Sequence, residues 1–159
     1  MENAIKDILM SHDDFKKLFG DVAAKFGFER AYGGWFMESH ETIIVLDLQK
    51  SNYGDYYYLN IKIYVQGLFG NRYRREKKLV KGDVGDVFTR APTEYDEIFK
   101  METGLDISDR ANRLYQLFSE YIQPMITLAS TRGGVLELGN SGRLYLLPAV
   151  RQALLDMEI

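Results

Sequence analysis

The chain has 159 residues, of which 46% are hydrophobic and 13% aromatic, and its formal net charge is −3. This composition supplies a packed core and excludes a disordered chain. Because the sequence has no cysteine, it has no disulfide framework, no thiolate nucleophile and no sulfur-ligated metal site.

The length predicts a single domain over residues 1–159. The first ten residues are too charged for a signal peptide, and no apolar run reaches the roughly 18 residues that a membrane-spanning helix needs. We therefore expect a cytoplasmic protein that has no membrane partner.

The first predicted element is an amphipathic helix that ends at Gly27. Ser11 and Asp14 form a capping-box-like start, and Gly27 has the position of a C′ glycine. The apolar stripe continues upstream, so residues 3–26 form either one long helix or two short ones. The stripe consists of Ile5, Ile8, Leu9, Phe15, Leu18, Phe19, Val22 and Phe26.

A strand at 35–38 follows, and then a β-hairpin at 42–66 around which the rest of the chain is organised. Gly54 lies in a segment rich in turn-forming residues, and a turn there places the apolar residues of both strands on one side of the sheet. This register pairs Leu48 with Leu59, Leu46 with Ile61, and Ile44 with Ile63.

The opposite face of the hairpin is polar in its middle, where Asp47 lies near Asn60 or Lys62. Such a face either meets water, with its side chains paired across the strands, or recognises a partner. Tyrosine is enriched here and is common in protein interfaces. We predict a recognition surface, unless the polar residues prove to be buried and satisfied by one another. The candidate binding residues are Asp47, Gln49, Lys50, Ser51, Tyr58, Asn60, Lys62 and Tyr64.

Residues 71–81 carry six basic side chains and one acid. This stretch either contacts nucleic-acid phosphates or is a solvated segment after an edge strand. The candidate nucleic-acid contacts are Arg72, Arg74, Arg75, Lys77, Lys78 and Lys81.

The remaining chain predicts a fourth strand at 86–90, a short helix through Met101 and a long helix at 108–130. Pro124 should kink the long helix, and Gly133-Gly134 should end it. A short extended piece at 135–138 and a loop at 139–142 precede a final helix that starts near Pro148.

Side chains suited to catalysis are few. His12 and His40 have no partner at metal-ligand spacing, and His12 is explained by the charged start of its helix. Phosphate-loop, nucleophile-elbow and zinc-protease motifs are absent. The sequence therefore predicts no catalytic residue, no metal and no cofactor. It favours a binding protein over a small enzyme, which would need a deep pocket with a titratable group of perturbed pKa.

Four segments between residues 11 and 66 carry a likeness to a known family. They are Gly27-Phe28, Trp35-Phe36, Gln49-Lys50-Ser51 and Tyr58-Leu59-Asn60-Ile61. In their order and spacing they resemble a bacterial family of uncharacterised proteins, the domain-of-unknown-function family 4304. The resemblance implies an α+β fold and a bacterial source. The family has no established activity, so the resemblance assigns no functional residue.

We therefore expect an α+β domain, with an antiparallel meander of about four strands packed by the N-terminal helix and the long C-terminal helix. The expected function is non-enzymatic binding of another protein by the polar face of the hairpin. Small bacterial proteins of this style sometimes act as toxin-neutralising immunity proteins. Nucleic-acid association through residues 71–81 and a small enzyme of unknown class are the alternatives.

Overall fold

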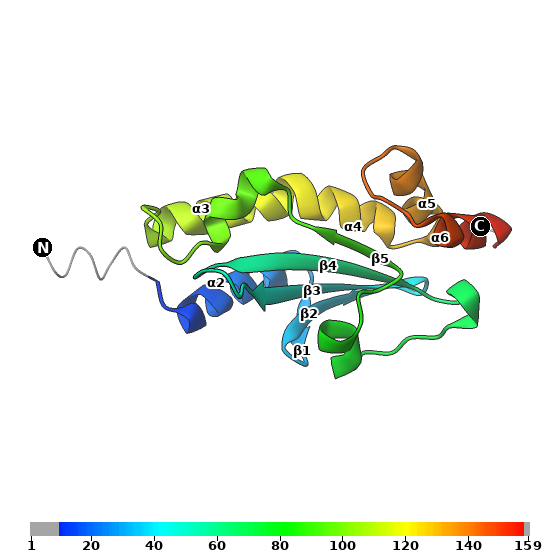
Figure 1. The fold of residues 1–159 in the computed structure, drawn as a ribbon, viewed down its shortest axis with the longest axis horizontal. Helices are drawn as coiled ribbons and strands as arrows, with labels where there is room; N and C mark the ends of the chain where they lie inside the picture. Colours follow the sequence, from blue (N-terminus) through cyan, green and yellow to red (C-terminus); the bar gives the residue numbers. More distant parts are fainter. Residues whose placement is uncertain (1–9, 158–159) are drawn as a thin grey trace, which may run out of the picture.

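The structure is a computed structural model that describes residues 10–157 (Figure 1). Its first described helix is α2, His12–Lys25. Ser11 caps this helix as predicted, since its hydroxyl accepts from the Asp14 N–H at 3.0 Å. Gly27 follows the helix with a φ of 94°, a conformation that favours glycine. The predicted upstream extension, with Ile5, Ile8 and Leu9, lies outside the described residues.

A five-stranded antiparallel meander forms the middle of the molecule, which confirms the α+β class. The sequence predicts about four strands, and the additional one is the three-residue strand at 29–31, too short to show a periodic pattern. The strands are β1 (Glu29–Ala31), β2 (Gly34–Glu38), β3 (Thr42–Lys50), β4 (Tyr57–Val65) and β5 (Val87–Arg90).

The register of the central hairpin is confirmed. The apolar residues of β3 and β4 share one face of the sheet, and that face belongs to the main core. The three predicted pairs all occur: Leu48–Leu59, Leu46–Ile61 and Ile44–Ile63.

One long helical rod covers this apolar face together with α2 (Figure 1). It comprises α3 (Ile107–Leu117), the π-helical turn η4 (Phe118–Ile122) and α4 (Gln123–Ala129). The wide turn lies directly before Pro124, whose missing N–H deprives the preceding turn of a helical hydrogen bond. At Pro124, where the sequence predicts a kink, the helix widens into this π-helical turn. Within residues 10–157, no helix is both long and apolar enough to cross a membrane.

The C-terminal segment corrects one prediction. Residues 135–138 are not extended but belong to helix α5 (Arg132–Asn140). Thr131 is the N-cap of α5, since its hydroxyl accepts from the Gly134 N–H at 2.9 Å. Gly133 and Gly134 therefore start a helix rather than end one. The final helix, α6 (Pro148–Asp156), starts at Pro148 as predicted.

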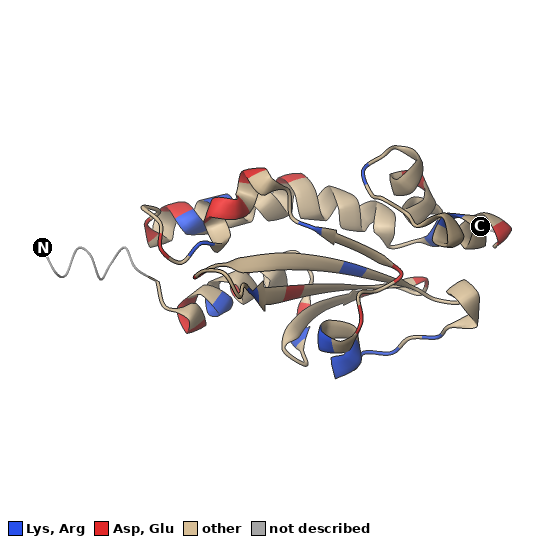
Figure 2. Ribbon diagram, viewed as in Figure 1, with Lys and Arg blue, Asp and Glu red and all other residues tan. Residues whose placement is uncertain are grey.

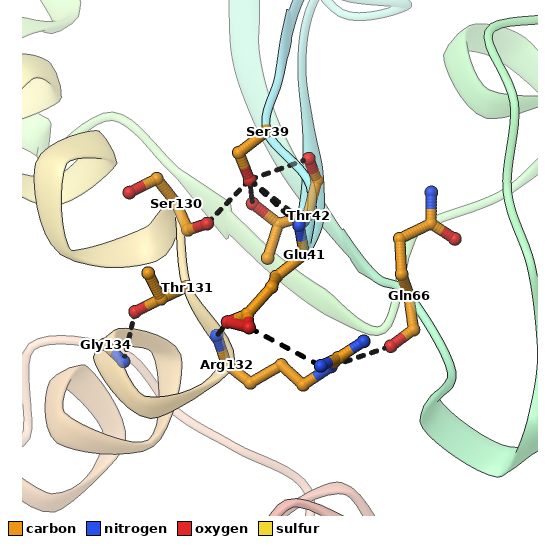
Figure 3. Close-up of polar contacts among 8 residues, drawn as sticks. All are labelled: Ser39, Glu41, Thr42, Gln66, Ser130, Thr131, Arg132 and Gly134. Atoms are coloured by element: carbon orange, nitrogen blue, oxygen red, sulfur yellow. Dashed lines mark hydrogen bonds and ion pairs between the residues drawn. The ribbon is translucent and has the colours of Figure 1, made fainter. Parts of the chain in front are cut away.

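A polar joint connects the sheet to the α4–α5 corner (Figure 3). The Thr42 hydroxyl donates to the Ala129 carbonyl at 2.7 Å, and the Ser39 hydroxyl donates to the Ser130 carbonyl at 2.6 Å. Glu41 accepts from the Arg132 N–H at 2.9 Å. The two hydroxyl contacts occupy carbonyls at the end of α4, and Glu41 satisfies an N–H in the first turn of α5.

Residues 71–83, called the strap below, cross the other face of the sheet. The strap follows the short turn η1 (Leu68–Gly70), includes the π-helical turn η2 (Lys78–Gly82) and returns to β5. The short helix η3, Thr93–Phe99, then leads to the long rod. Leu79 and Val80 of the strap pack on Phe36, Ile43 and Val45 as a second, smaller core. Both faces of the central strands are therefore covered.

Candidate binding groove

The polar strip of the hairpin is divided into a buried inner part and an exposed outer part. Asp47, Asn60 and Lys62 expose only 4–5% of their surface. Gln49 and Lys50, at the outer end of β3, are exposed. The strap causes this difference, because it covers the inner part and leaves the outer part open.

Asp47 is the centre of the inner part. Its carboxylate lies 2.8 Å from Lys81 Nζ and 3.9 Å from Lys62 Nζ. Asn60 Nδ2 donates to the same carboxylate at 3.4 Å. A buried charge needs such partners, and Asp47 has two cations and an amide.

Lys62 and Tyr64 hold the strap to the sheet. Lys62 Nζ donates to the Val80 carbonyl at 2.6 Å, and the Tyr64 hydroxyl donates to the Leu79 carbonyl at 2.7 Å. Burial lowers the pKa of Lys62, against the opposing effect of Asp47. These residues therefore act structurally in the inner strip. Ser51 does so in the hairpin loop, where its hydroxyl accepts from the Tyr53 N–H at 3.0 Å.

The outer part contains an arginine that the sequence did not single out. Arg90 Nε donates to Asn60 Oδ1 at 2.9 Å, and Arg90 Nη2 donates to Gln49 Oε1 at 3.3 Å. Its guanidinium lies 4.2 Å from the centre of the Tyr58 ring. Pairing of β5 with β4 brings Arg90 opposite Asn60, a contact over thirty residues that no local pattern predicts.

An open groove of about 840 Å³ runs along the inner and outer parts of the strip. We define the groove by His12 and Lys16 of α2, residues 47–50 of β3, Tyr57, Asn60 and Lys62 of β4, residues 80–83 of the strap with the adjoining Val84, and Phe88 with Arg90 of β5. Five cations and two carboxylates line it. They are Lys16, Lys50, Lys62, Lys81 and Arg90, against Asp47 and Asp83.

His12 has a role that the sequence did not predict. Ser11 caps the helix, and His12 instead turns toward the hairpin loop, with Nε2 2.8 Å from Asp55 Oδ1 and Nδ1 2.7 Å from the Tyr57 hydroxyl. Burial and Asp55 raise the pKa of Tyr57. The raised pKa disfavours a phenolate nucleophile, and the two contacts of His12 tie α2 to the hairpin.

The basic stretch is largely neutralised by nearby carboxylates. Arg75 pairs with Glu29 at 3.2 Å and with Glu38 at 3.1 Å. Arg74, Lys78 and Lys81 also have acidic partners. Figure 2 shows the Lys and Arg residues of the basic stretch on the strap, on the side of the sheet away from the long rod. Of the six candidate nucleic-acid contacts, Arg72 and Lys77 have no ion pair within residues 10–157.

No group of three acidic or histidine side chains able to hold a metal ion occurs in the described part of the chain. The candidate site is a cationic groove beside the β-hairpin of an α+β domain. The strap covers part of the sheet face that lies opposite the main core.

The comparison with protein families identifies the chain. The family model for the domain of unknown function DUF4304 matches residues 19–128, and the chain belongs to this family. The match includes the sheet, the strap and almost all of the long rod, and it ends before α5. Comparisons with curated proteins and with solved structures give no match.

Proposed function

We propose that the protein is a binding protein that holds an acidic partner protein in the groove. The observation that carries this proposal is the excess of cations in the groove of a chain whose net charge is −3. A concave surface lined by charges of one sign attracts a partner of the opposite sign. The proposal keeps the outer polar face of the hairpin as the recognition surface and adds α2, the strap and β5.

The rim of the groove has the composition of a protein interface. Val84 and Phe88 are 64% and 39% exposed, next to the cations. Lys16 has no carboxylate partner among the described residues, and its Nζ lies 5.8 Å from the centre of the Tyr57 ring. Exposed apolar and aromatic side chains beside cations favour a polypeptide as the partner.

An immunity protein that neutralises a toxin is one example of such a binding protein. The comparison rests on size and fold class. The proposal includes a cytoplasmic location, because a chain without cysteine forms no disulfide that would need an oxidising compartment.

A charge-reversal experiment tests the proposal. The double variant Lys16→Glu/Lys50→Glu changes the groove, and Arg72→Glu/Lys77→Glu makes the same charge change on the strap outside it. Each tagged protein is used to capture partners from cells of the source organism at low and at high salt. We expect a stoichiometric acidic protein that binds the wild type and the strap variant, and binds the groove variant about tenfold more weakly.

Two outcomes contradict the proposal. Equal capture by the groove variant would show that the partner binds elsewhere. Nucleic acid that is captured at low salt and lost from the strap variant would instead favour the basic stretch as the functional surface.

A further inference from the structure

Arg90 is held in the groove by neutral groups. It is an exposed side chain, and its contacts are the amide oxygens of Asn60 and Gln49 and the rings of Tyr58 and Phe88. Among the described residues, no carboxylate forms an ion pair with it. Its position is therefore fixed while its positive charge remains uncompensated.

The contacts of Arg90 use one edge of the guanidinium. Nε and Nη2 form the edge that faces Asn60 and Gln49. The remaining edge, made by Nη1 and the second hydrogen of Nη2, has no acceptor in the described residues. Two parallel N–H groups on one edge match the two oxygens of a carboxylate or of a phosphoryl group.

The hydrogen bonds to Gln49 Oε1 also determine which way the Gln49 side-chain amide is oriented. Gln49 Oε1 accepts from Asn60 Nδ2 at 2.9 Å as well as from Arg90. A reversed Gln49 amide would place N–H groups against these two donors, so the network fixes its orientation. Gln49 Nε2 is consequently left with its two hydrogens for a ligand, and the exposed edge of the network has donors without acceptors.

Lys81 is a further cation that lines the same groove. Its Nζ is 2.8 Å from Asp47, and its side chain is half exposed. Asp47 also compensates the buried Lys62, so one carboxylate serves two lysines. Asp83, the second carboxylate of the groove, lies 3.8 Å from Lys78 Nζ, so Asp47 and Asp83 together face three lysines.

We propose that Arg90 and Gln49 form an oxyanion subsite in the groove that Lys81 also lines. In this subsite, the free edge of Arg90 and the amide of Gln49 bind two oxygens of one anionic group. This inference rests on the proposed function: the group is a carboxylate presented by the acidic partner. A phosphoryl group has the same donor requirement, and the test separates the two sources.

The test uses two defined probes, a hexaglutamate peptide and inorganic phosphate, each titrated into the full chain at low salt. Binding is followed by calorimetry and by NMR of the side-chain N–H groups. We expect saturable binding of the peptide, with shifts of the Gln49 amide and the Arg90 guanidinium. Saturation by phosphate alone, with the same shifts, would assign the subsite to phosphoryl groups instead.

Substitution of Arg90 separates its geometry from its charge. Arg90→Lys keeps the charge and removes the paired N–H groups, so we expect binding about tenfold weaker. Arg90→Gln should weaken it further, whereas Arg72→Gln, at an exposed arginine outside the groove, should leave it unchanged. Thermal unfolding of each variant confirms that the fold is kept. Unchanged affinity in both Arg90 variants would overturn the subsite.

The subsite and the proposed function fail in different ways. If Lys16→Glu/Lys50→Glu abolishes peptide binding and Arg90→Lys does not, the groove binds acidic partners without the subsite. If neither change affects the binding of the peptide or of the captured partner, both inferences are wrong.

Discussion

Arg110 shows how a single residue can hold two segments together. It is 1% exposed and lies on α3, and its guanidinium donates to the carbonyls of Ile98 and Lys100 and to the Thr103 hydroxyl. The first two contacts satisfy carbonyls at the end of η3. Burial lowers the pKa of Arg110, although Glu97 opposes this effect. The charge is thus stabilised mainly by backbone dipoles.

We predict that Arg110→Met lowers the free energy of unfolding by about 2–3 kcal/mol, because it leaves two carbonyls without their charged donor. Arg113→Met is the control on the same helix. Arg113 pairs with Glu97 at 3.0 Å in a more exposed position, and its loss should cost at most about 1 kcal/mol. Urea unfolding measures both values. Equal effects would show that the buried contacts of Arg110 contribute little.

At the same scale, the sequence predicted which side chains of the hairpin are polar but not which are buried. Asp47, Asn60 and Lys62 alternate with apolar residues just as the exposed Gln49 does. Their burial depends on Leu79 and Val80, which lie in a stretch that reads as solvated because it is basic. The strap and the hairpin are distant in the sequence, so their contact produces no local sequence pattern that could predict this burial.

At the scale of elements, the strap is attached to the sheet by tyrosines. The Tyr73 N–H donates to Gln66 Oε1, and the Tyr73 carbonyl accepts from Gln66 Nε2. The Tyr73 hydroxyl donates to Asp86 at 3.1 Å. Burial, followed by Asp86, raises the pKa of Tyr73 to about 12 from the usual 10.0. Burial also raises the pKa of Tyr64, whose hydroxyl holds the Leu79 carbonyl.

These shifts predict a loss of stability at alkaline pH. A phenol whose pKa is raised by folding stabilises the folded state below pH 10, and this stabilisation is lost as the pH rises through about 12. The free energy of unfolding should therefore fall over this interval, and less steeply in Tyr73→Phe. Tyr53→Phe, at a 92% exposed position, should follow the wild type. Identical slopes in all three proteins would refute the contribution of Tyr73.

At the scale of the whole molecule, short-range signals in the sequence were enough for four of the five strands and for the start of the first described helix. Gly54 and the alternating apolar residues determined the register of β3 and β4, and Ser11 marked the start of α2. The same reasoning failed at α5, because two glycines usually end a helix. Thr131 was the signal for the opposite interpretation, as a Ser or Thr three residues before a helical N–H is a typical N-cap. The groove could not be predicted, since its walls come from five separate segments of the chain.

Gly134 closes the corner that joins the long rod to α5. A Cβ atom at Gly134 would lie 1.7 Å from the Leu128 carbonyl oxygen, a distance that only a backbone shift could relieve. The neighbouring Gly133 has open space around its Cα. This close approach positions Thr131, which caps α5, and Arg132, whose N–H donates to Glu41 in the polar joint (Figure 3).

We therefore predict opposite effects for two adjacent glycines. Gly134→Ala should lower the free energy of unfolding by more than about 2 kcal/mol, since the added methyl group displaces the corner and weakens the bonds to Glu41 and Thr42. Gly133→Ala should be neutral or raise stability by up to about 1 kcal/mol, because alanine favours the helix. Urea unfolding compares the two variants. If Gly134→Ala is as stable as Gly133→Ala, the corner has enough freedom to move, and its close packing is not what fixes α5 against the sheet.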